Sequence, residues 1–236
     1  MRVLVTRPLQ DALETARLLE AMEHHALIAP LLEIRFLDGP QLSRNGVQAV
    51  LATSANGVRA FARRTTDRAI PVFAVGMQTA EAAKAAGFAN VRSADGDADA
   101  LAKAVAQWAR PDAGVLLHAA GKEAEGKLEA DLKCAGFSVQ RETLYEAVAA
   151  TELTAEVAQA LKASTLDAAL FFSPRSARIF CECVNHLGLG DQVRGLVVCC
   201  ISAKAANALT LVFQEVRIAE RPNQDALLHC LGSKRF

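Results

Sequence analysis

Residues 50–61 read VLATSANGVRAF, and residues 169–180 repeat this segment in altered form as ALFFSPRSARIF. Each copy begins with apolar residues typical of a strand, reaches a serine, and continues with the spacing of an amphipathic helix. The two serines, Ser54 and Ser173, can cap these helices. The first backbone N–H groups and the partial positive charge of such a helix favour an anion. The repeat therefore predicts two similar edges that face an anionic ligand.

The repeat extends outward from this segment along nearly the whole chain. Short apolar runs alternate with longer helical patterns, which is typical of βα units around a parallel sheet. Residues 70–80 recur in altered form as residues 196–206, and residues 114–118 echo residues 2–6. The predicted fold class is therefore α/β with parallel sheets.

The order of the repeats predicts two domains. The middle of the chain holds a complete set of strands, whereas the partners of its last two strands lie at the N-terminus. The two repeats become equivalent if the N-terminal βαβ segment joins the C-terminal third of the chain in one domain. We expect a discontinuous α/β domain of residues 1–36 plus 148–236 and an inserted α/β domain of residues 38–145, joined by a two-segment hinge that allows motion between them.

Composition narrows the class of ligand and the compartment. The chain has 236 residues, and 26 Lys and Arg balance 26 Asp and Glu, so no overall field attracts nucleic acid or a membrane. Few aromatic residues argue against surfaces that stack on bases. No segment is typical of a signal peptide or a membrane span. We expect a soluble, cytoplasmic protein whose cysteines are free thiols in a reducing compartment.

In an open parallel sheet, ligands bind beyond the carboxyl ends of the strands. The predicted ends carry small, polar or basic residues, which suit a ligand with many carboxylates in a cleft between the two domains. The candidate binding residues at these ends are Thr6, Arg7, Ser54, Ala55, Asn56, Gly76, Thr79, His118, Ser173, Pro174, Arg175, Ser176 and Ser202.

Several of these residues also have a purely structural interpretation. Ser54 and Ser173 can be plain helix caps, which is compatible with binding. Arg7 precedes Pro8 at a helix start, where a cation opposes the helix dipole, and this favours a binding role. His118 is predicted to end a strand at the ligand edge, where it could act as a general acid.

Three patterns resemble nucleotide or metal sites, but each departs from its motif. The segment GKEAEGK at residues 121–127 meets most of the P-loop pattern, yet Leu128 stands where Mg²⁺ needs a Ser or Thr. Cys181, Cys183 and His186 have a zinc-like spacing, but no second Cys/His pair follows them. Asp95, Asp97 and Asp99 resemble a calcium loop, but an acidic helix start explains them better. We expect no metal and no cofactor.

Five segments together resemble the uroporphyrinogen-III synthases of tetrapyrrole biosynthesis. They are VLVTRP at 3–8, TSANGV at 53–58, AVG at 74–76, LY at 144–145 and FSPRSA at 172–177. The resemblance covers nearly the whole chain and implies two flavodoxin-like domains joined by a flexible two-stranded connection. It implies a lyase of porphyrin and heme biosynthesis that cyclises hydroxymethylbilane, a linear tetrapyrrole with many carboxylates, without a cofactor. The product is uroporphyrinogen III, formed with loss of water and inversion of the last pyrrole ring.

The same resemblance implies a catalytic role for Tyr145, the only tyrosine in the chain. At this position the family carries its best-known functional side chain, so we expect its phenol to hydrogen-bond the departing hydroxyl and assist proton transfer. Loss of the hydroxyl gives an electrophilic azafulvene, and attack by the last ring then gives a spiro intermediate. A phenol near its ordinary pKa donates a proton but is a poor base at neutral pH.

Two alternatives stay open at this stage. Tyr145 could be an ordinary aromatic of the hinge, with a packed ring and a solvated hydroxyl. The whole protein could be a non-catalytic two-domain binding protein for a small polyanion. We expect a monomer, and the sequence leaves open a transient contact with the upstream bilane-forming enzyme.

Overall fold

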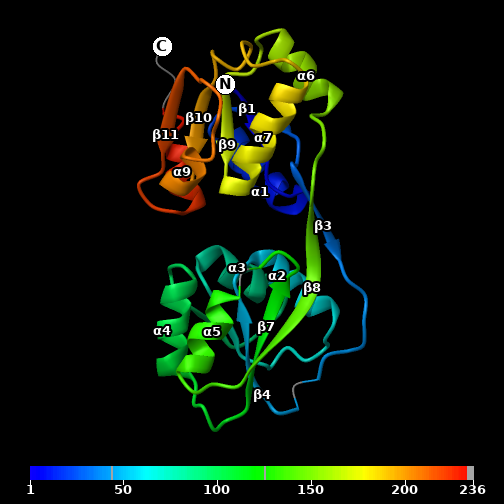
Figure 1. Ribbon diagram of the computed structural model, residues 1–236, viewed down its shortest axis with the longest axis vertical. Helices are drawn as coiled ribbons and strands as arrows, with labels where there is room; N and C mark the ends of the chain where they lie inside the picture. The colour runs from blue at the N-terminus through cyan, green and yellow to red at the C-terminus, as the bar shows by residue number, and fades with distance from the viewer. Residues whose placement is uncertain (44, 125, 233–236) are drawn as a thin grey trace. The chain divides into compact units, whose positions relative to one another are not determined.

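The structure, a computed structural model, describes residues 1–43, 45–124 and 126–232. The chain divides into two compact units: unit 1 comprises Met1–Glu33 and Val148–Phe236, and unit 2 comprises Ile34–Ala147. Each unit holds a predominantly parallel sheet with helices on both faces (Figure 1). The predicted α/β class is confirmed.

Unit 1 is built on a five-stranded sheet with the order β11-β10-β9-β1-β2, in which every neighbouring pair is parallel. Its strands are β1 (Arg2–Val5), β2 (His25–Ile28), β9 (Ala168–Phe171), β10 (Val197–Cys200) and β11 (Glu215–Ile218). Its helices are α1 (Leu9–Ala21), α6 (Ala155–Lys162), α7 (Pro174–His186), α8 (Ala203–Ala206) and α9 (Gln224–His229). Buried side chains of α6, α7 and α8 pack on one face of the sheet, and those of α1 and α9 on the other. The unit therefore has three layers.

Unit 2 is built on a six-stranded sheet with the order β3-β8-β7-β4-β5-β6. Its strands are β3 (Leu32–Phe36), β4 (Val47–Ala52), β5 (Val72–Ala74), β6 (Val91–Ser93), β7 (Val115–Gly121) and β8 (Val139–Ala149). Its helices are α2 (Ala55–Arg63), α3 (Met77–Ala85), α4 (Ala98–Trp108) and α5 (Lys127–Cys134). Buried side chains of α2 and α3 contact one face of the sheet, and those of α4 and α5 contact the other.

The two sheets confirm the internal repeat. Read in one direction, unit 1 has the order β2-β1-β9-β10-β11 and unit 2 has β8-β7-β4-β5-β6. The equivalent central strands, β9 and β4, are each followed by a serine and a helix. The order along the sequence differs between the units. Strands β7 and β8 come last in the sequence of unit 2, whereas their equivalents in unit 1, β1 and β2, come first.

The segments that join the units form a strand pair, as the family resemblance implies. Strand β3 spans Leu32–Phe36, and β8 continues from Val139 to Ala149. The Leu37 N–H donates to the carbonyl of Leu144, and the Ala150 N–H donates to that of Leu31, at 2.8 and 3.0 Å. One strand advances while the other recedes, so β3 and β8 are antiparallel neighbours. Figure 1 shows them side by side.

Helix α2 lies very close to the sheet at its first turn. A Cβ atom added to Gly57 would lie 2.4 Å from the carbonyl oxygen of Ala119 in β7. Only a glycine permits this approach of helix to strand. The approach fixes the start of α2, and with it Ser54, against the carboxyl-terminal half of β7.

We predict that Gly57→Ala destabilises the protein, although alanine is the better helix former by about 1 kcal/mol. Overpacking against a backbone atom costs about 1–3 kcal/mol, and each kcal/mol lowers the melting temperature of a protein of this size by about 2–4 °C. Thermal unfolding followed by circular dichroism measures the change. Gly195→Ala is the matched control, because nothing lies within 4 Å of an added Cβ there. An unchanged or raised melting temperature for Gly57→Ala would contradict the packing argument.

Candidate active site

Three helices begin at a serine in the same backbone conformation. Ser54 before α2, Ser173 before α7 and Ser202 before α8 have φ angles of −156°, −158° and −160°. Each serine side chain accepts a hydrogen bond from the backbone N–H three residues further on, at 3.0, 3.1 and 3.3 Å respectively. The predicted capping by Ser54 and Ser173 is therefore confirmed. The remaining free N–H groups of the first turn can still receive an anion.

These helix starts gather at one edge of each sheet. In unit 2, β4, β5, β6, β7 and β8 are parallel, so Ser54 and Gly76, the residue that precedes α3, lie at the same carboxyl edge. In unit 1, the same reasoning places Ser173 and Ser202 at one edge. Each unit therefore presents its own set of helix starts, as expected from the repeat.

The other predicted binding residues differ in how far solvent can reach them. Asn56, Pro174 and Arg175 are exposed or half-buried at the starts of α2 and α7. The remaining ones are buried, namely Thr6, Arg7, Ala55, Thr79, His118 and Ser176. The structure therefore separates residues at the surface of the helix starts from residues that lie beneath it.

Thr6 and Arg7 have partners inside unit 1. The Thr6 hydroxyl donates to the carbonyl of Leu170 at 2.8 Å and so ties β1 to β9. The Arg7 guanidinium is only 5% exposed, pairs with Asp11 at 3.6 Å and lies 4.0 Å from the centre of the Phe172 ring. Asp11 in the first turn of α1 offsets the cation there. A structural ion pair therefore explains the position of the cation, and a binding role for Arg7 stays a prediction.

Tyr145 reaches Ser54 because β8 contains an irregularity. Ala120 pairs with Thr143, but the next residue, Gly121, pairs with Tyr145, so one extra residue of β8 is accommodated between them. That extra residue is Leu144, which is fully buried in the core. A bulge of this kind changes the direction of the side chains that follow it. The Tyr145 hydroxyl consequently lies 2.8 Å from the Ser54 Oγ.

Gly121 makes room for the phenol ring. A Cβ atom on this residue would lie 2.8 Å from the Tyr145 Cζ and 3.0 Å from its hydroxyl oxygen. The ring is thus seated directly over the end of β7. The seat, the bulge and the hydrogen bond to Ser54 together fix the position of the hydroxyl.

The environment keeps Tyr145 protonated. Burial raises the pKa of the phenol, the hydrogen bond from Ser54 acts in the opposite direction, and the charge of Glu123 raises it again, so that the net pKa lies above the ordinary value. A phenol in this state can donate a proton at neutral pH but cannot serve as a base.

His118 does not end its strand, as the sequence analysis expects, because β7 continues to Gly121. The imidazole is 1% exposed and both of its nitrogens have partners. Nε2 lies 3.2 Å from the Thr53 Oγ1, and Nδ1 lies 2.7 Å from the Glu129 Oε1. His118 is therefore the centre of a buried chain of three polar side chains.

Glu129 is the charged end of this chain. Its carboxyl is 6% exposed and also pairs with Arg141 at 3.7 Å. Burial raises the Glu129 pKa, but the hydrogen bond from His118 and the charges of His118 and Arg141 outweigh burial, so the pKa lies below its ordinary value. Glu129 is therefore ionised at neutral pH and favours a proton on the His118 Nδ1.

Sequence reasoning missed three residues of this region. Thr53 appeared only as part of a motif, while Glu129 and Gly121 were not singled out for the site. Thr53 is adjacent to a predicted site residue and carries a hydroxyl, which is a usable signal. Glu129 has no such signal, because its contact with His118 depends on how α5 packs on β7.

The patterns that resemble nucleotide and metal sites have structural explanations. Lys127, in the P-loop-like segment, pairs with Asp99 and Asp131, and Glu125 lies outside the described residues. Asp97 caps α4 by accepting from the Ala100 N–H at 3.0 Å, which confirms the expected acidic helix start. Among the described residues, no group of His, Cys, Asp and Glu side chains could hold a metal ion, and no helix is long and apolar enough to cross a membrane.

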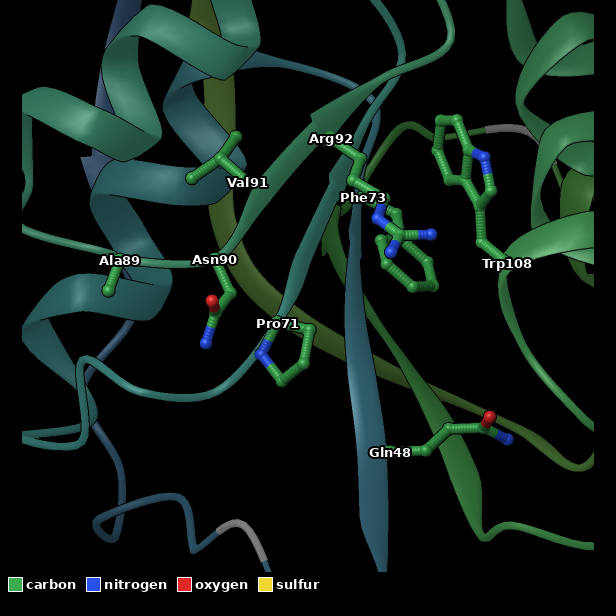
Figure 2. A pocket seen from close by; sticks show the side chains of 8 residues that line it. All are labelled: Gln48, Pro71, Phe73, Ala89, Asn90, Val91, Arg92 and Trp108. Atoms are coloured by element: carbon green, nitrogen blue, oxygen red, sulfur yellow. The ribbon is translucent and has the colours of Figure 1, made fainter.

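Unit 2 also has an open hollow away from Ser54 and Tyr145. It is lined by Gln48, Pro71, Phe73, Ala89, Asn90, Val91, Arg92 and Trp108 (Figure 2). Several of these residues belong to the starts of β4, β5 and β6, which is the edge opposite to the helix starts. None of them is a predicted binding residue, so this hollow is separate from the candidate active site.

Comparison with known proteins gives one family and a shared fold. The family model described as uroporphyrinogen-III synthase HemD matches residues 14–229. The solved uroporphyrinogen-III synthetase of Helicobacter pylori is 19% identical, has a TM-score of 0.65 and is covered over 100% of both chains. A mutant uroporphyrinogen III synthase of Thermus thermophilus is also 19% identical, with a TM-score of 0.53 and 98% of both chains covered. We found no match among curated protein sequences.

We predict that the single tyrosine titrates above its ordinary pKa of about 10. A pH titration followed by the near-ultraviolet absorbance of the phenolate measures Tyr145 alone, since the chain has no other tyrosine. Ser54→Ala should move the midpoint further upward, because it removes a hydrogen bond that lowers the pKa. Ser173→Ala, the equivalent change in unit 1, should leave it in place. A midpoint no higher than that of the denaturant-unfolded chain would refute the described environment of Tyr145.

Proposed function

Because the chain belongs to the uroporphyrinogen-III synthase family, we infer that it is a cyclising lyase, which converts hydroxymethylbilane to uroporphyrinogen III with loss of water and inversion of the last pyrrole ring. The match to the family spans most of the chain, and the fold is that of the solved synthases. A non-catalytic binding protein, the alternative, has no observation in its favour.

We propose that Tyr145 donates the proton with which the terminal hydroxyl leaves as water. The observation that carries this proposal is the hydrogen bond of 2.8 Å between the Tyr145 hydroxyl and the Ser54 Oγ, at the carboxyl edge of unit 2. The raised pKa supports it, because the acid must be protonated before each turnover. Ser54 holds the phenol in place and can itself be displaced as a partner by the substrate hydroxyl.

We propose that the helix starts bind the carboxylates of the substrate. The proposed contacts in unit 2 are the first turn of α2 with Ser54, Ala55 and Asn56, and the start of α3 with Gly76. Those in unit 1 are the first turn of α7 with Ser173, Pro174 and Arg175, and the single turn α8 with Ser202. Thr6, Arg7, Thr79, His118 and Ser176 support these contacts from within each unit, since they are buried.

Dispersed binding of this kind matches the chemical problem. The substrate is flexible and carries carboxylates on every ring, and the isomer that forms depends on which atom of the last ring meets the electrophilic carbon. Holding several carboxylates at once restricts the linear substrate to a bent conformation. This proximity effect can lower the activation free energy by about 7 kcal/mol or more. Backbone N–H groups suit this purpose, because they bind charge without adding positive charge to a neutral protein.

Further proposals concern the setting of the enzyme. We propose that it works in the cytoplasm, since six free cysteines, four of them buried, suit a reducing compartment. We also propose that it acts as a monomer and that it can receive its substrate in a transient contact with the upstream bilane-forming enzyme.

The direct test of the reaction is product analysis. The purified protein is incubated with freshly prepared hydroxymethylbilane, the products are oxidised, and the isomers are separated. Isomer III should form faster than isomer I appears in a blank without protein. Isomer I alone, at the rate of the blank, would exclude the proposed reaction.

In the same assay, we predict that Tyr145→Phe lowers kcat by about 100-fold or more, which is the usual contribution of a general acid. The variant keeps the ring and loses only the hydroxyl. Its affinity for uroporphyrinogen III, measured by calorimetry without oxygen, should stay within about twofold of the original, because the product has no hydroxyl left to protonate. An unchanged kcat would remove Tyr145 from the mechanism.

For the binding surface, we predict that Ser173→Asp weakens the affinity for uroporphyrinogen III by at least about tenfold. Two like charges about 4 Å apart repel by up to about 4 kcal/mol near a protein surface, and tenfold requires only about 1.4 kcal/mol. Ser173→Asn is the matched control, since Asp and Asn cap helices about as well as Ser. Both variants should keep the melting temperature, and only the Asp variant should lose affinity. Equal affinity of the two variants would show that Ser173 acts as a cap alone.

A further inference from the structure

We propose that Thr53 is a second catalytic residue, whose hydroxyl takes up the proton released when the last ring closes and passes its own proton to His118. This inference rests on the proposed cyclisation. The Thr53 Oγ1 lies 3.2 Å from the His118 Nε2, and the His118 Nδ1 lies 2.7 Å from the Glu129 Oε1. A hydroxyl, an imidazole and a carboxylate in this sequence form a relay that can move a proton away from the hydroxyl.

The relay ends beside the proposed acid. Thr53 and Ser54 are consecutive at the carboxyl end of β4, and successive side chains of a strand point to opposite faces. Ser54 meets Tyr145 on the face of α2 and α3, whereas Thr53 meets His118 on the face of α4 and α5. Thr53 is half-buried, so unlike His118 it can be reached by a ligand. The end of β4 thus places the proposed acid on one face of the sheet and a hydroxyl that can accept a proton on the other.

The surroundings of His118 favour an imidazole that accepts at Nε2. Glu129 from α5 accepts a hydrogen bond from the Nδ1–H, which leaves the lone pair on Nε2 for the Thr53 hydroxyl at the end of β4. Arg141 on β8 is paired in register with His118, and its guanidinium lies 3.7 Å from the same Glu129 oxygen. When His118 gains a second proton, the carboxylate stabilises the imidazolium at 2.7 Å. In the part of the chain that the structure describes, these are the titratable and charged groups that contact His118 or its carboxylate partner.

A purely structural role explains the chain of three side chains less well. Burying an ionised pair carries a desolvation cost, and apolar residues of similar size often give the same stability. The second oxygen, Oε2, of Glu129 is buried without a hydrogen-bond partner among the residues that the structure describes. Buried ionisable groups arranged beside an active site are typical of proton transfer.

The proton balance of the reaction requires such an outlet. One C–O bond breaks, and the hydroxide leaves as water with the Tyr145 proton. When the final C–C bond forms, the pyrrole carbon that attacks the electrophilic carbon still carries a hydrogen. Its C–H bond must break so that the electron pair restores the aromatic pyrrole. The proton goes to the Thr53 oxygen as the Thr53 proton moves to the His118 Nε2. After the product leaves, the proton on His118 returns through the Thr53 hydroxyl to solvent, which also supplies a proton to Tyr145.

The test compares Thr53→Val, which removes the hydroxyl at nearly constant size, with Thr53→Ser, which retains it. We expect Thr53→Val to lower kcat by about 100-fold and Thr53→Ser to restore most of it. The variant should still form isomer III, because folding of the substrate does not depend on the relay. Thr65→Val is the control, since it also removes a buried hydroxyl from unit 2, away from this site, and it should leave kcat unchanged.

The pH dependence distinguishes proton transfer from packing. In the original protein, kcat should fall at low pH as the Glu129 carboxylate, which stabilises the imidazolium, becomes protonated. The pKa of this carboxyl lies below its ordinary value, so the fall should begin below that value. Glu129→Gln removes the carboxyl, so it should slow the reaction and abolish this fall. The change can be measured even if Thr53→Val does not fold. The same fall at low pH in Glu129→Gln, or original kcat for Thr53→Val, would overturn the relay while isomer III from the original protein upholds the cyclisation.

Discussion

The structure depends on one local constraint, which is the serine that ends a parallel strand and begins a helix. The side chain of this serine satisfies one N–H of the first turn and leaves the others pointing outward. Because parallel strands end at the same edge, repeating the junction at β4 in unit 2 and at β9 and β10 in unit 1 collects helix starts without any excess of basic residues. These helix starts are the basis of the proposal that a neutral chain binds a polyanion through its backbone.

A second constraint converts the connection between the units into part of the site. Strand β8 continues through the connection and carries Tyr145, whose direction depends on the bulge at Leu144. The leucine enters the core, and the tyrosine is seated over Gly121. Stability and chemistry are thus linked through neighbouring residues, because the same irregularity that completes the core also sets the phenol against Ser54.

The parts of the fold that depend on local pattern could be predicted from the sequence. The caps at Ser54 and Ser173 and the paired strand orders follow from residue types and their spacing. The antiparallel pair of β3 and β8 is implied only by the family resemblance, since the residues of β3 alternate only weakly and pair with β8 across a long separation. The buried position of His118 could not be predicted for a related reason. Because β7 continues three residues beyond His118, this side chain lies in the buried part of the strand and not at an exposed end. The contact of His118 with Glu129 depends on how α5 packs on the sheet.

Each unit has its own edge of capped helix starts, but the two units differ in the polar side chains beneath that edge. In unit 2, His118 pairs with Leu51; in unit 1, the equivalent pair is Val5 and Leu170. The sequence repeat aligns Thr6 with His118, but the strand registers place Val5 there, so the imidazole has an apolar counterpart. The position of Thr53 is taken by Phe172, which is covered by the Arg7 guanidinium. Unit 1 therefore keeps the capped helix starts without the relay, while unit 2 carries both the proposed acid and the proposed outlet for the proton. Such a division suits a reaction in which many carboxylates must be held but bonds change only where the two ends of the substrate meet.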